Sequence, residues 1–364
     1  MHVVLAGGGT AGHVAPALAT ADALRRSDPA VGITALGTER GLEKQLVPAH
    51  GYELALIPAV PLPRRPSGDL LTLPARLRTA IRNAAEVLHA SVADVVVGFG
   101  GYVSLPTYLA ARRLSVPIVV HEANSIPGLA NRIGARLTRH VAVASPQIRL
   151  PHATHVGIPL RRSVATLDRA AERAAARAAF GLRPDLPTLL VFGGSQGARR
   201  INTAMAGVVA ALTAAGIQVL HAVGAGNESA VATVVGDVPY VAVPYVERME
   251  LAYAAADLAL CRAGAITCAE IAAVGLPAIF VPLPHGNGEQ RLNARPLMAA
   301  GGALLVDDAA LTGTWVAEHV PSLLADGARL AAMSEKGALL GRRDADERLA
   351  QMVRRAAAGT GGSW

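Results

Sequence analysis

The sequence predicts an α/β protein with two Rossmann-like, parallel-sheet domains that face each other across a central cleft. Two glycine-rich turns, each between an apolar strand and a helix, predict this fold. The first is Gly7–Gly12, near the N-terminus, and the second is Gly193–Gly197, about half a chain later. Each turn could present backbone N–H groups and a helix N-terminus to an anion. A length of 364 residues suits two domains of ordinary size.

Alternating strands and helices build the first predicted domain, residues 1–161. Continuous runs of valine, isoleucine and leucine indicate strands that are buried on both faces, as in a parallel sheet. The predicted strands are 2–6, 31–36, 92–97, 116–120 and 141–144, and the predicted helices are 14–26 and 40–49. Gly157–Arg161 reads as a stiff linker that ends the domain.

The pattern starts again in the second predicted domain, residues 162–341, which opens with a helix over 167–180. The predicted strands are 188–192, 217–222, 239–243, 258–261 and 278–281, and the helices between them are 198–214, 247–255 and 266–274. A long polar loop, 282–290, follows the last strand, and ligands of open α/β sheets bind beyond such carboxyl ends. Residues 342–364 are predicted to form a helix from Asp344 that packs back on the first domain, followed by a frayed tail.

Composition limits the class of protein. Hydrophobic residues make up 52% of the chain and aromatic residues only 3%, so the cores are built from alanine, valine and leucine. Cys261 and Cys268 fit neither a disulfide framework nor a paired metal-ligand spacing, which favours a reducing cytoplasm. The sequence has no apolar run of about 18 residues and no visible signal peptide, so we expect neither a membrane span nor export.

The net charge of +7 is compatible with nucleic-acid binding, but other features argue against it. Two tryptophans, six tyrosines and four phenylalanines leave little for base stacking, and no motif for duplex DNA is visible. We therefore expect no nucleic-acid partner. The positive charge is concentrated in the first half of the chain. Its clustered arginines are Arg64, Arg65, Arg76, Arg78, Arg82, Arg112 and Arg113.

The first glycine turn also fits a dinucleotide-binding pattern, with Gly7, Gly9 and Gly12 as G-x-G-x-x-G. That reading needs an acidic residue at the end of the second strand to hold the ribose. The predicted strand ends in Leu36-Gly37-Thr38, and Glu39 follows late. A dehydrogenase is therefore weakened, but it stays open as an alternative, as does a non-catalytic module that binds a nucleotide without transfer.

A third possible anion site lies in the second half. Cys261–Thr267 follows a predicted strand and opens a helix, whose N-terminus favours a phosphate. Glu270 lies one turn inside that helix and could accept hydrogen bonds from ribose hydroxyls. The alternative for Glu270 is favourable placement of a negative charge near a helix N-terminus.

Several motifs together resemble the MurG family of GT-B glycosyltransferases, over nearly the whole chain. In order they are Gly8-Gly9-Thr10-Ala11-Gly12-His13, Gly100-Gly101-Tyr102, His121-Glu122-Ala123-Asn124, Gly193-Gly194-Ser195-Gln196-Gly197, Cys261-Arg262-Ala263-Gly264-Ala265-Ile266-Thr267, and Glu289-Gln290 before Asn293-Ala294. The resemblance implies an inverting hexosyltransferase. It would move N-acetylglucosamine from UDP-N-acetylglucosamine to lipid I and make lipid II for peptidoglycan synthesis.

The resemblance also implies which residues bind the donor. In the second domain Ser195 would bind the diphosphate, Glu270 the ribose hydroxyls and Gln290 the sugar. The remaining donor residues there are Val246 and Met249, which would flank the uracil, and Ala265, Ile266, Thr267, Cys268 and Ala269. From the first domain, Thr10, Ala11 and Gly12 would face the transferred sugar. Asn124 and Arg161 would reach the phosphates of the donor or the acceptor.

The expected chemistry is one displacement at the anomeric carbon, which needs a base near the attacking hydroxyl. His13 is favoured because it is the only ionisable group in the first turn and histidine titrates near neutrality. Its alternative role is a helix-start histidine bonded to the backbone. Glu122 and His121 are rival bases, or they orient the acceptor together with Tyr102.

We expect no metal and no cofactor. Charge on the departing UDP would rest on helix N-termini and Ser195. The one Asp-x-Asp sequence is Asp344-Ala345-Asp346, which reads better as a helix N-terminal cap than as a metal site.

A membrane-anchored acceptor implies peripheral docking at the cytoplasmic face of the cell membrane. Leu70, Leu73, Leu77 and Ile81 recur at helix-like spacing among Arg76, Arg78 and Arg82, with a helix start near Pro74. Such a basic amphipathic segment suits an anionic headgroup layer, although a core-facing helix with solvated arginines is the alternative. A sister GT-B enzyme for another aglycone also remains open, and it would differ over 60–82 and 100–126.

Overall fold

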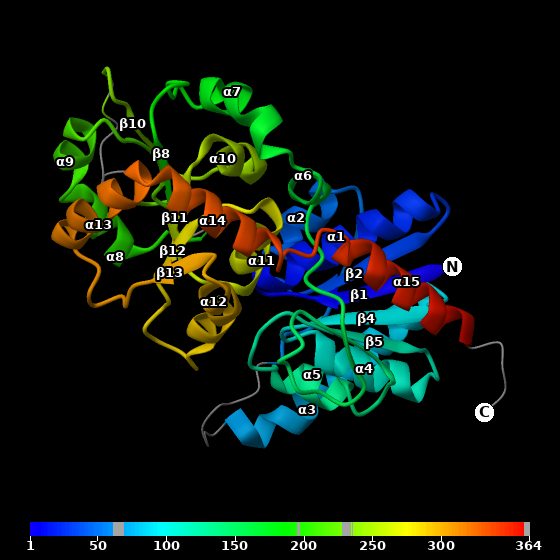
Figure 1. Cartoon of the computed structure of the whole chain (residues 1–364). Coiled ribbons are helices and arrows are strands. Elements are labelled where there is room, and N and C mark those ends of the chain that lie inside the picture. The colour runs from blue at the N-terminus through cyan, green and yellow to red at the C-terminus, as the bar shows by residue number, and fades with distance from the viewer. Residues whose placement is uncertain (61–68, 195–196, 228–233, 235, 360–364) are drawn as a thin grey trace. The chain divides into compact units, whose positions relative to one another are not determined.

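The computed structural model describes residues 1–60, 69–194, 197–227, 234 and 236–359, with the backbone alone at Ala11 and at 69–71. The chain divides into two compact units. One holds Met1–Arg161 and the chain from Arg343 onward, and the other holds Arg162–Arg342. Each unit is built on one parallel sheet with helices packed against it (Figure 1). The prediction of two parallel-sheet α/β domains is confirmed.

The first unit contains a seven-stranded sheet in the order β3-β2-β1-β4-β5-β6-β7. Its strands are β1 (His2–Gly7), β2 (Gly32–Gly37), β3 (Glu53–Leu56), β4 (Val95–Gly100), β5 (Ile118–Glu122), β6 (His140–Val143) and β7 (Ala153–His155). Its helices are α1 (Ala11–Ser27), α2 (Glu43–Ala49), α3 (Asp69–Ala90), α4 (Ser104–Arg113), α5 (Leu129–Gly134) and α15 (Ala345–Ala358). Val3 and Leu5 of β1 pack with α1 and α15, whereas Val4 packs with α3 and α4 on the opposite face.

The second unit contains a six-stranded sheet in the order β10-β9-β8-β11-β12-β13. Its strands are β8 (Thr188–Phe192), β9 (Gln218–Ala222), β10 (Tyr240–Val243), β11 (Leu258–Cys261), β12 (Ala278–Phe280) and β13 (Ala303–Leu305). Its helices are α6 (Arg162–Ala165), α7 (Arg169–Ala179), α8 (Arg199–Ala206), α9 (Val209–Ala214), α10 (Met249–Ala255), α11 (Ala265–Val274), α12 (Glu289–Ala300), α13 (Gly313–Ala325) and α14 (Gly327–Ala338). Its core joins Leu189 and Val191 of β8 to α8, α9 and α13.

The last helix, α15, packs along α1 of the first unit, as Figure 1 shows. Asp346 accepts a hydrogen bond from Arg26 at 2.5 Å, and Arg354 donates to Ser27. Asp344 occupies the N-cap position, but its carboxylate accepts from Arg348 at 2.6 Å and makes no capping bond to the backbone. The expected cap is therefore right in position and wrong in its hydrogen bond.

Several expected boundaries are wrong for local reasons. The strand expected from Val92 begins at Val95, because Val92 has a φ of 47° and lies in a turn. The strand expected from Val116 begins at Ile118. The helix expected over 198–214 is two helices, α8 and α9, with Val208 non-helical between them. The polar loop after β12 ends where α12 begins at Glu289.

The helix α3 starts at Asp69, so Pro74 lies within it rather than at its start. Its apolar stripe contributes to the core of the first unit through Leu77, Ile81, Ala84 and Leu88. Its arginines are exposed, namely Arg76, Arg78 and Arg82. A membrane-facing role for Leu77 and Ile81 is therefore wrong, and the side chain of Leu70 is not among those described. Of the helices in the described part of the chain, none is long and apolar enough to span a bilayer.

Candidate functional site

The site residues of the first unit gather where β1 and β4 lie side by side. The connections after these two strands lead to opposite sides of the sheet, and such a switch point opens a crevice at the carboxyl ends of the strands. The turn 8–13 follows β1, Tyr102 follows β4, and the loop with Asn124 follows the next strand, β5. Thr10 and Gly12 are exposed at this edge, and Tyr102 is 51% exposed.

His13 lies in the first turn of α1, and the loop after β4 closely approaches it. Its Nδ1 is 3.2 Å from the Gly8 carbonyl oxygen and 3.2 Å from Thr10 Oγ1. A carbonyl can only accept, so a neutral His13 that donates from Nδ1 would take up a proton at Nε2. A Cβ on Gly100 would lie 3.0 Å from Nε2, and one on Gly101 would lie 2.4 Å from the Gly8 oxygen. The two glycines are therefore required for this approach.

Glu122 holds the loop that follows β5. The residue is 2% exposed, and its carboxylate accepts from the backbone N–H groups of Asn124 and Gly128, both at 2.9 Å. The side chain of Asn131 also donates to it at 3.0 Å, and Asn131 in turn accepts from Tyr108 at 2.8 Å. A buried carboxylate with these partners organises the loop that carries Asn124, so Glu122 is a weaker candidate base than His13.

His121 cannot contact an acceptor in this structure, because its side chain is fully buried within β5. Its Nε2–H donates to the Gly157 carbonyl at 2.8 Å, while Nδ1 has no hydrogen-bond partner among the described residues. Burial lowers the pKa of His121 to about 4, so the ring stays neutral. The expectation that His121 orients the acceptor or acts as the base is corrected: it joins β5 to the segment that ends in Arg161.

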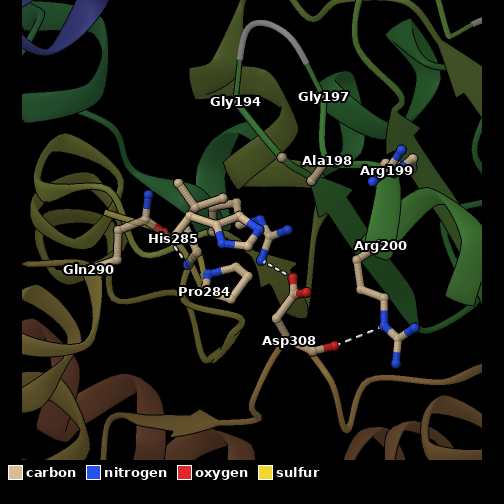
Figure 2. A pocket seen from close by; sticks show the side chains of 12 residues that line it. Gly194, Gly197, Ala198, Arg199, Arg200, Pro284, His285, Gln290 and Asp308 are labelled. Atoms are coloured by element: carbon tan, nitrogen blue, oxygen red, sulfur yellow. Dashed lines mark hydrogen bonds and ion pairs between the residues drawn. The ribbon is translucent and has the colours of Figure 1, made fainter. Parts of the chain in front are cut away.

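The second unit has a matching switch point between β8 and β11, and a pocket of about 480 Å³ opens there (Figure 2). The second glycine turn forms one side of it, through Gly193, Gly194 and Gly197. The loop after β12 and the start of α12 form the other, through Leu283, Pro284, His285 and Gln290. Arg199, Arg200, Arg262, Ala198 and Asp308 complete the lining.

Two of the lining arginines are held by Asp308. Arg262 forms an ion pair with its carboxylate at 2.5 Å and donates to the Val281 carbonyl at 3.0 Å. Arg200 donates from Nε to the Asp308 carbonyl at 2.8 Å, and dashed lines in Figure 2 mark the interactions of Asp308. Three guanidinium groups against one carboxylate leave the pocket positive, which suits a diphosphate.

Gln290 also lines this pocket, and a hydrogen bond of its own side chain fixes its position. Its Oε1 accepts from the backbone N–H of Leu283 at 2.9 Å, which closes the polar loop onto the first turn of α12. The amide Nε2 of Gln290 is a donor suited to a sugar hydroxyl.

Glu270 lies on α11, beyond the pocket lining. Its Oε2 accepts from the hydroxyl of Tyr253 at 2.7 Å, and the Tyr253 ring packs edge-on against Phe192 at 6.2 Å. Phe192 is the last residue of β8 and directly precedes the glycine turn. The carboxylate is therefore held next to the turn by α10, which also carries Met249.

The start of α11 offers the remaining donor candidates. Ala265, Ile266, Thr267 and Ala269 are partly exposed, as is Met249 of α10. Cys268 is not, because its thiol is buried and its backbone N–H donates to Gly264 within the helix at 2.9 Å. The expectation that Cys268 contacts the sugar-nucleotide donor is therefore corrected. Val246 is 3% exposed, so its side chain has little surface to offer a base. Ser195 lies outside the described residues.

The sequence left several site residues unassigned. Arg262 stood within a quoted motif and His285 within the polar loop, so both had a signal. Arg199, Arg200 and Asp308 had no such signal. The two arginines begin α8 and Asp308 follows β13, and sequence spacing does not reveal that these segments line one pocket. The described residues contain no group of three or more metal-ligating side chains that could hold a metal ion.

Comparisons with known proteins agree with this geometry. Residues 3–143 match the glycosyltransferase family 28 N-terminal domain, and residues 188–349 match the family 28 C-terminal domain. A Streptomyces avermitilis protein is 65% identical over 97% of this chain and 98% of its own length. An Acidothermus cellulolyticus protein is 64% identical over 98% of both. Both are named UDP-N-acetylglucosamine--N-acetylmuramyl-(pentapeptide) pyrophosphoryl-undecaprenol N-acetylglucosamine transferase.

Solved structures show the same fold. Acinetobacter baumannii MurG superposes with a TM-score of 0.78 at 28% identity, covering 97% of this chain and 99% of its own. CalG4, the calicheamicin glycosyltransferase, superposes with a TM-score of 0.68 over 99% of both chains. Its 19% identity supports the fold alone.

Proposed function

The chain belongs to glycosyltransferase family 28, and from that membership we infer that it is a UDP-N-acetylglucosamine-dependent hexosyltransferase. It transfers N-acetylglucosamine to the undecaprenyl-pyrophosphoryl acceptor, lipid I, and so makes lipid II for peptidoglycan. The observation that carries this conclusion is 65% identity with a relative of that name over 97% of this chain. The dehydrogenase and the other-aglycone alternatives are thereby set aside.

We propose that the second unit binds the donor in three neighbouring places. The positive pocket at the second glycine turn takes the diphosphate, with Arg199, Arg200 and Arg262 supplying charge. The Glu270 carboxylate, which Tyr253 holds, takes the ribose hydroxyls. Gln290 takes the sugar. The partly exposed start of α11 adds backbone N–H groups.

The reaction needs a proton acceptor and a stabilised leaving group. His13 is the proposed base, because its Nδ1 faces the Gly8 carbonyl and Nε2 can take the proton of the attacking hydroxyl. As the bond from the anomeric carbon to the diphosphate oxygen breaks, negative charge grows on UDP. The pocket arginines and the helix N-termini stabilise that charge, and we expect no requirement for a metal.

We also propose peripheral docking on an anionic membrane at its cytoplasmic face. The apolar stripe of α3 faces the core, so the proposed contact is electrostatic and uses the exposed Arg76, Arg78 and Arg82. Arg112 and Arg113 close α4, which follows β4, whereas α3 precedes it. Both helices run antiparallel to β4, so the C-terminus of α4 lies toward the C-terminus of α3 at Ala90, away from the N-terminal half of α3 that carries Arg76 and Arg78. The proposed contact therefore does not include these two arginines. Arg64 and Arg65 lie outside the described residues.

Release of UDP tests the transferase assignment. The full chain with UDP-N-acetylglucosamine should release UDP only when a short-chain lipid I analogue is present, and a chelator should leave the rate nearly unchanged. Equal release without the acceptor would indicate a hydrolase instead, and complete loss with chelator that Mg²⁺ restores would contradict the metal-free mechanism.

A further inference from the structure

A buried carboxylate lies under the first glycine turn. Glu43 is the first residue of α2 and its side chain is fully buried. Its Oε2 accepts from the Gly9 N–H at 2.9 Å, and its Oε1 accepts from the Thr38 N–H at 2.7 Å and from Thr38 Oγ1 at 3.0 Å. One side chain therefore ties the turn after β1 to the turn after β2.

Three glycines make room for this carboxylate. A Cβ on Gly8 would lie 2.7 Å from Glu43 Oε1, and one on Gly41 would lie 2.0 Å from Oε2. A Cβ on Gly37 would lie 2.2 Å from Glu43 Cγ. Real Cβ atoms do not approach so closely, so the cradle fits Glu43 only while all three positions lack a side chain.

The position of Glu43 has a clear meaning in a nucleotide-binding fold. There the glycine turn offers its N–H groups to a phosphate, and an acidic residue after the second strand takes the ribose. Here the acidic residue after β2 is turned inward and takes the Gly9 N–H for itself. A phosphate at this turn would lose that donor and would lie close to a negative charge.

The same carboxylate also lies close to the turn residue that contacts His13. Gly8 lies between them, because its Cα faces Glu43 while its carbonyl oxygen lies 3.2 Å from His13 Nδ1. Gly101 also approaches this carbonyl, since a Cβ on Gly101 would lie 2.4 Å from the Gly8 oxygen. A shift of the turn away from Glu43 would therefore move the carbonyl that orients the His13 ring.

We propose that Glu43 is a positioning residue that fixes the first glycine turn as a site for an uncharged, hydroxyl-bearing sugar and excludes phosphate from it. The inference rests on the proposed transferase function for the identity of the sugar. The exclusion of phosphate stands without it. All diphosphate groups would then bind outside this turn, and the turn would serve the hydroxyl that His13 deprotonates.

Kinetics of Glu43→Gln in the full chain test the positioning role. The variant should lower kcat at least tenfold while its UDP affinity, measured by calorimetry, stays within twofold of the wild type. Retained UDP binding reports an intact second unit.

Glu53→Gln is the matched control, since Glu53 also accepts from a threonine hydroxyl, Thr34 at 3.0 Å, but lies on β3 away from the turn. It should leave kcat unchanged. A wild-type kcat in Glu43→Gln would overturn the role.

A titration with inorganic phosphate tests the exclusion without any turnover. The full chain is labelled with ¹⁵N-glycine and saturated with UDP, which blocks the positive pocket of the second unit. The Gly9 and Gly12 amide signals of the wild type should not move, whereas Glu43→Ala, which frees the Gly9 N–H, should show saturable shifts. Saturable shifts in the wild type would overturn the exclusion. This outcome is independent of whether the protein transfers N-acetylglucosamine.

Discussion

At the scale of single residues, the proposed function separates donor binding from proton transfer. Glu270 is the residue proposed to hold the ribose, and a charged acceptor binds hydroxyls more strongly than a neutral amide. Glu270→Gln should therefore weaken UDP binding by about tenfold, as calorimetry would measure. Tyr253→Phe, which removes the 2.7 Å partner but keeps the charge, should have the smaller effect. Equal UDP affinity in Glu270→Gln and the wild type would remove Glu270 from the site.

His13 is the residue on which the proposed chemistry depends most. His13→Ala should lower kcat by about 100-fold or more with UDP affinity nearly intact, because general-base catalysis contributes to the transition state and not to donor binding. Steady-state kinetics at saturating donor and acceptor measure the loss. An unchanged kcat would move the base to another group, and Glu122 is the next candidate.

His121 makes stability depend on pH. Burial depresses its pKa from 6.5 to about 4, so the unfolded chain binds a proton in this interval that the folded chain does not. Its contribution to stability is complete above pH 6.5 and is lost as the pH falls toward 4. Between pH 6.5 and 5 the free energy of unfolding should fall with a slope that approaches about 1.4 kcal/mol per pH unit for this proton. Urea unfolding of His121→Asn should lack that part of the slope, and parallel pH profiles would contradict the assignment.

At the scale of elements, α3 carries the membrane prediction. Each arginine near an anionic surface contributes about 1 kcal/mol, screened by salt. Vesicles that contain anionic lipid should bind the protein less as ionic strength rises, and changing Arg76, Arg78 and Arg82 together to serine should reduce binding further. Transfer to a soluble acceptor analogue should survive these changes. Sedimentation that responds to neither salt nor substitution would exclude α3 as the docking element.

Elements were predictable from sequence where a long apolar run or a glycine turn marked them. The strand 188–192 and the helices α1 and α15 follow from such signals. The strands β3, β7 and β13, of three or four residues, were not predicted, although the equally short β11 and β12 were. The helix α4 was not predicted from sequence, because its buried residues include Ser104, Thr107 and Tyr108, which do not form an apolar stripe. Tertiary packing, not local pattern, forms these elements.

The site was predictable to the extent that its residues lie in contiguous motifs. The turn with His13, the segment Cys261–Thr267 and Glu270 were all singled out as candidates from sequence, and their roles stay predictions. Glu43 was missed because it comes six residues after the end of β2 and only the fold brings it under the first turn. The pairing of Arg262 with Asp308 was missed for the same reason, since 46 positions of chain separate them. Long-range hydrogen bonds leave no local sequence signal.

The whole molecule repeats one plan in two units. Each has a parallel sheet with a switch point, at β1 and β4 in the first unit and at β8 and β11 in the second, and each carries its site residues there. In the second unit, arginines lie beside the glycine turn and make the pocket there positive. In the first unit, the Glu43 carboxylate accepts a hydrogen bond from the glycine turn. Under the proposed function, this difference favours the second unit for the charged part of the donor and the first unit for the reacting hydroxyl.

The most direct test of this account is the product itself. The full chain is incubated with UDP-N-acetylglucosamine and a short-chain lipid I analogue, and the product is analysed by mass spectrometry and NMR. The account predicts that the acceptor gains one N-acetylhexosamine unit and that the new linkage is β, since a single displacement inverts the α-linked donor. An unmodified acceptor, or a new linkage that retains the α configuration, would contradict it.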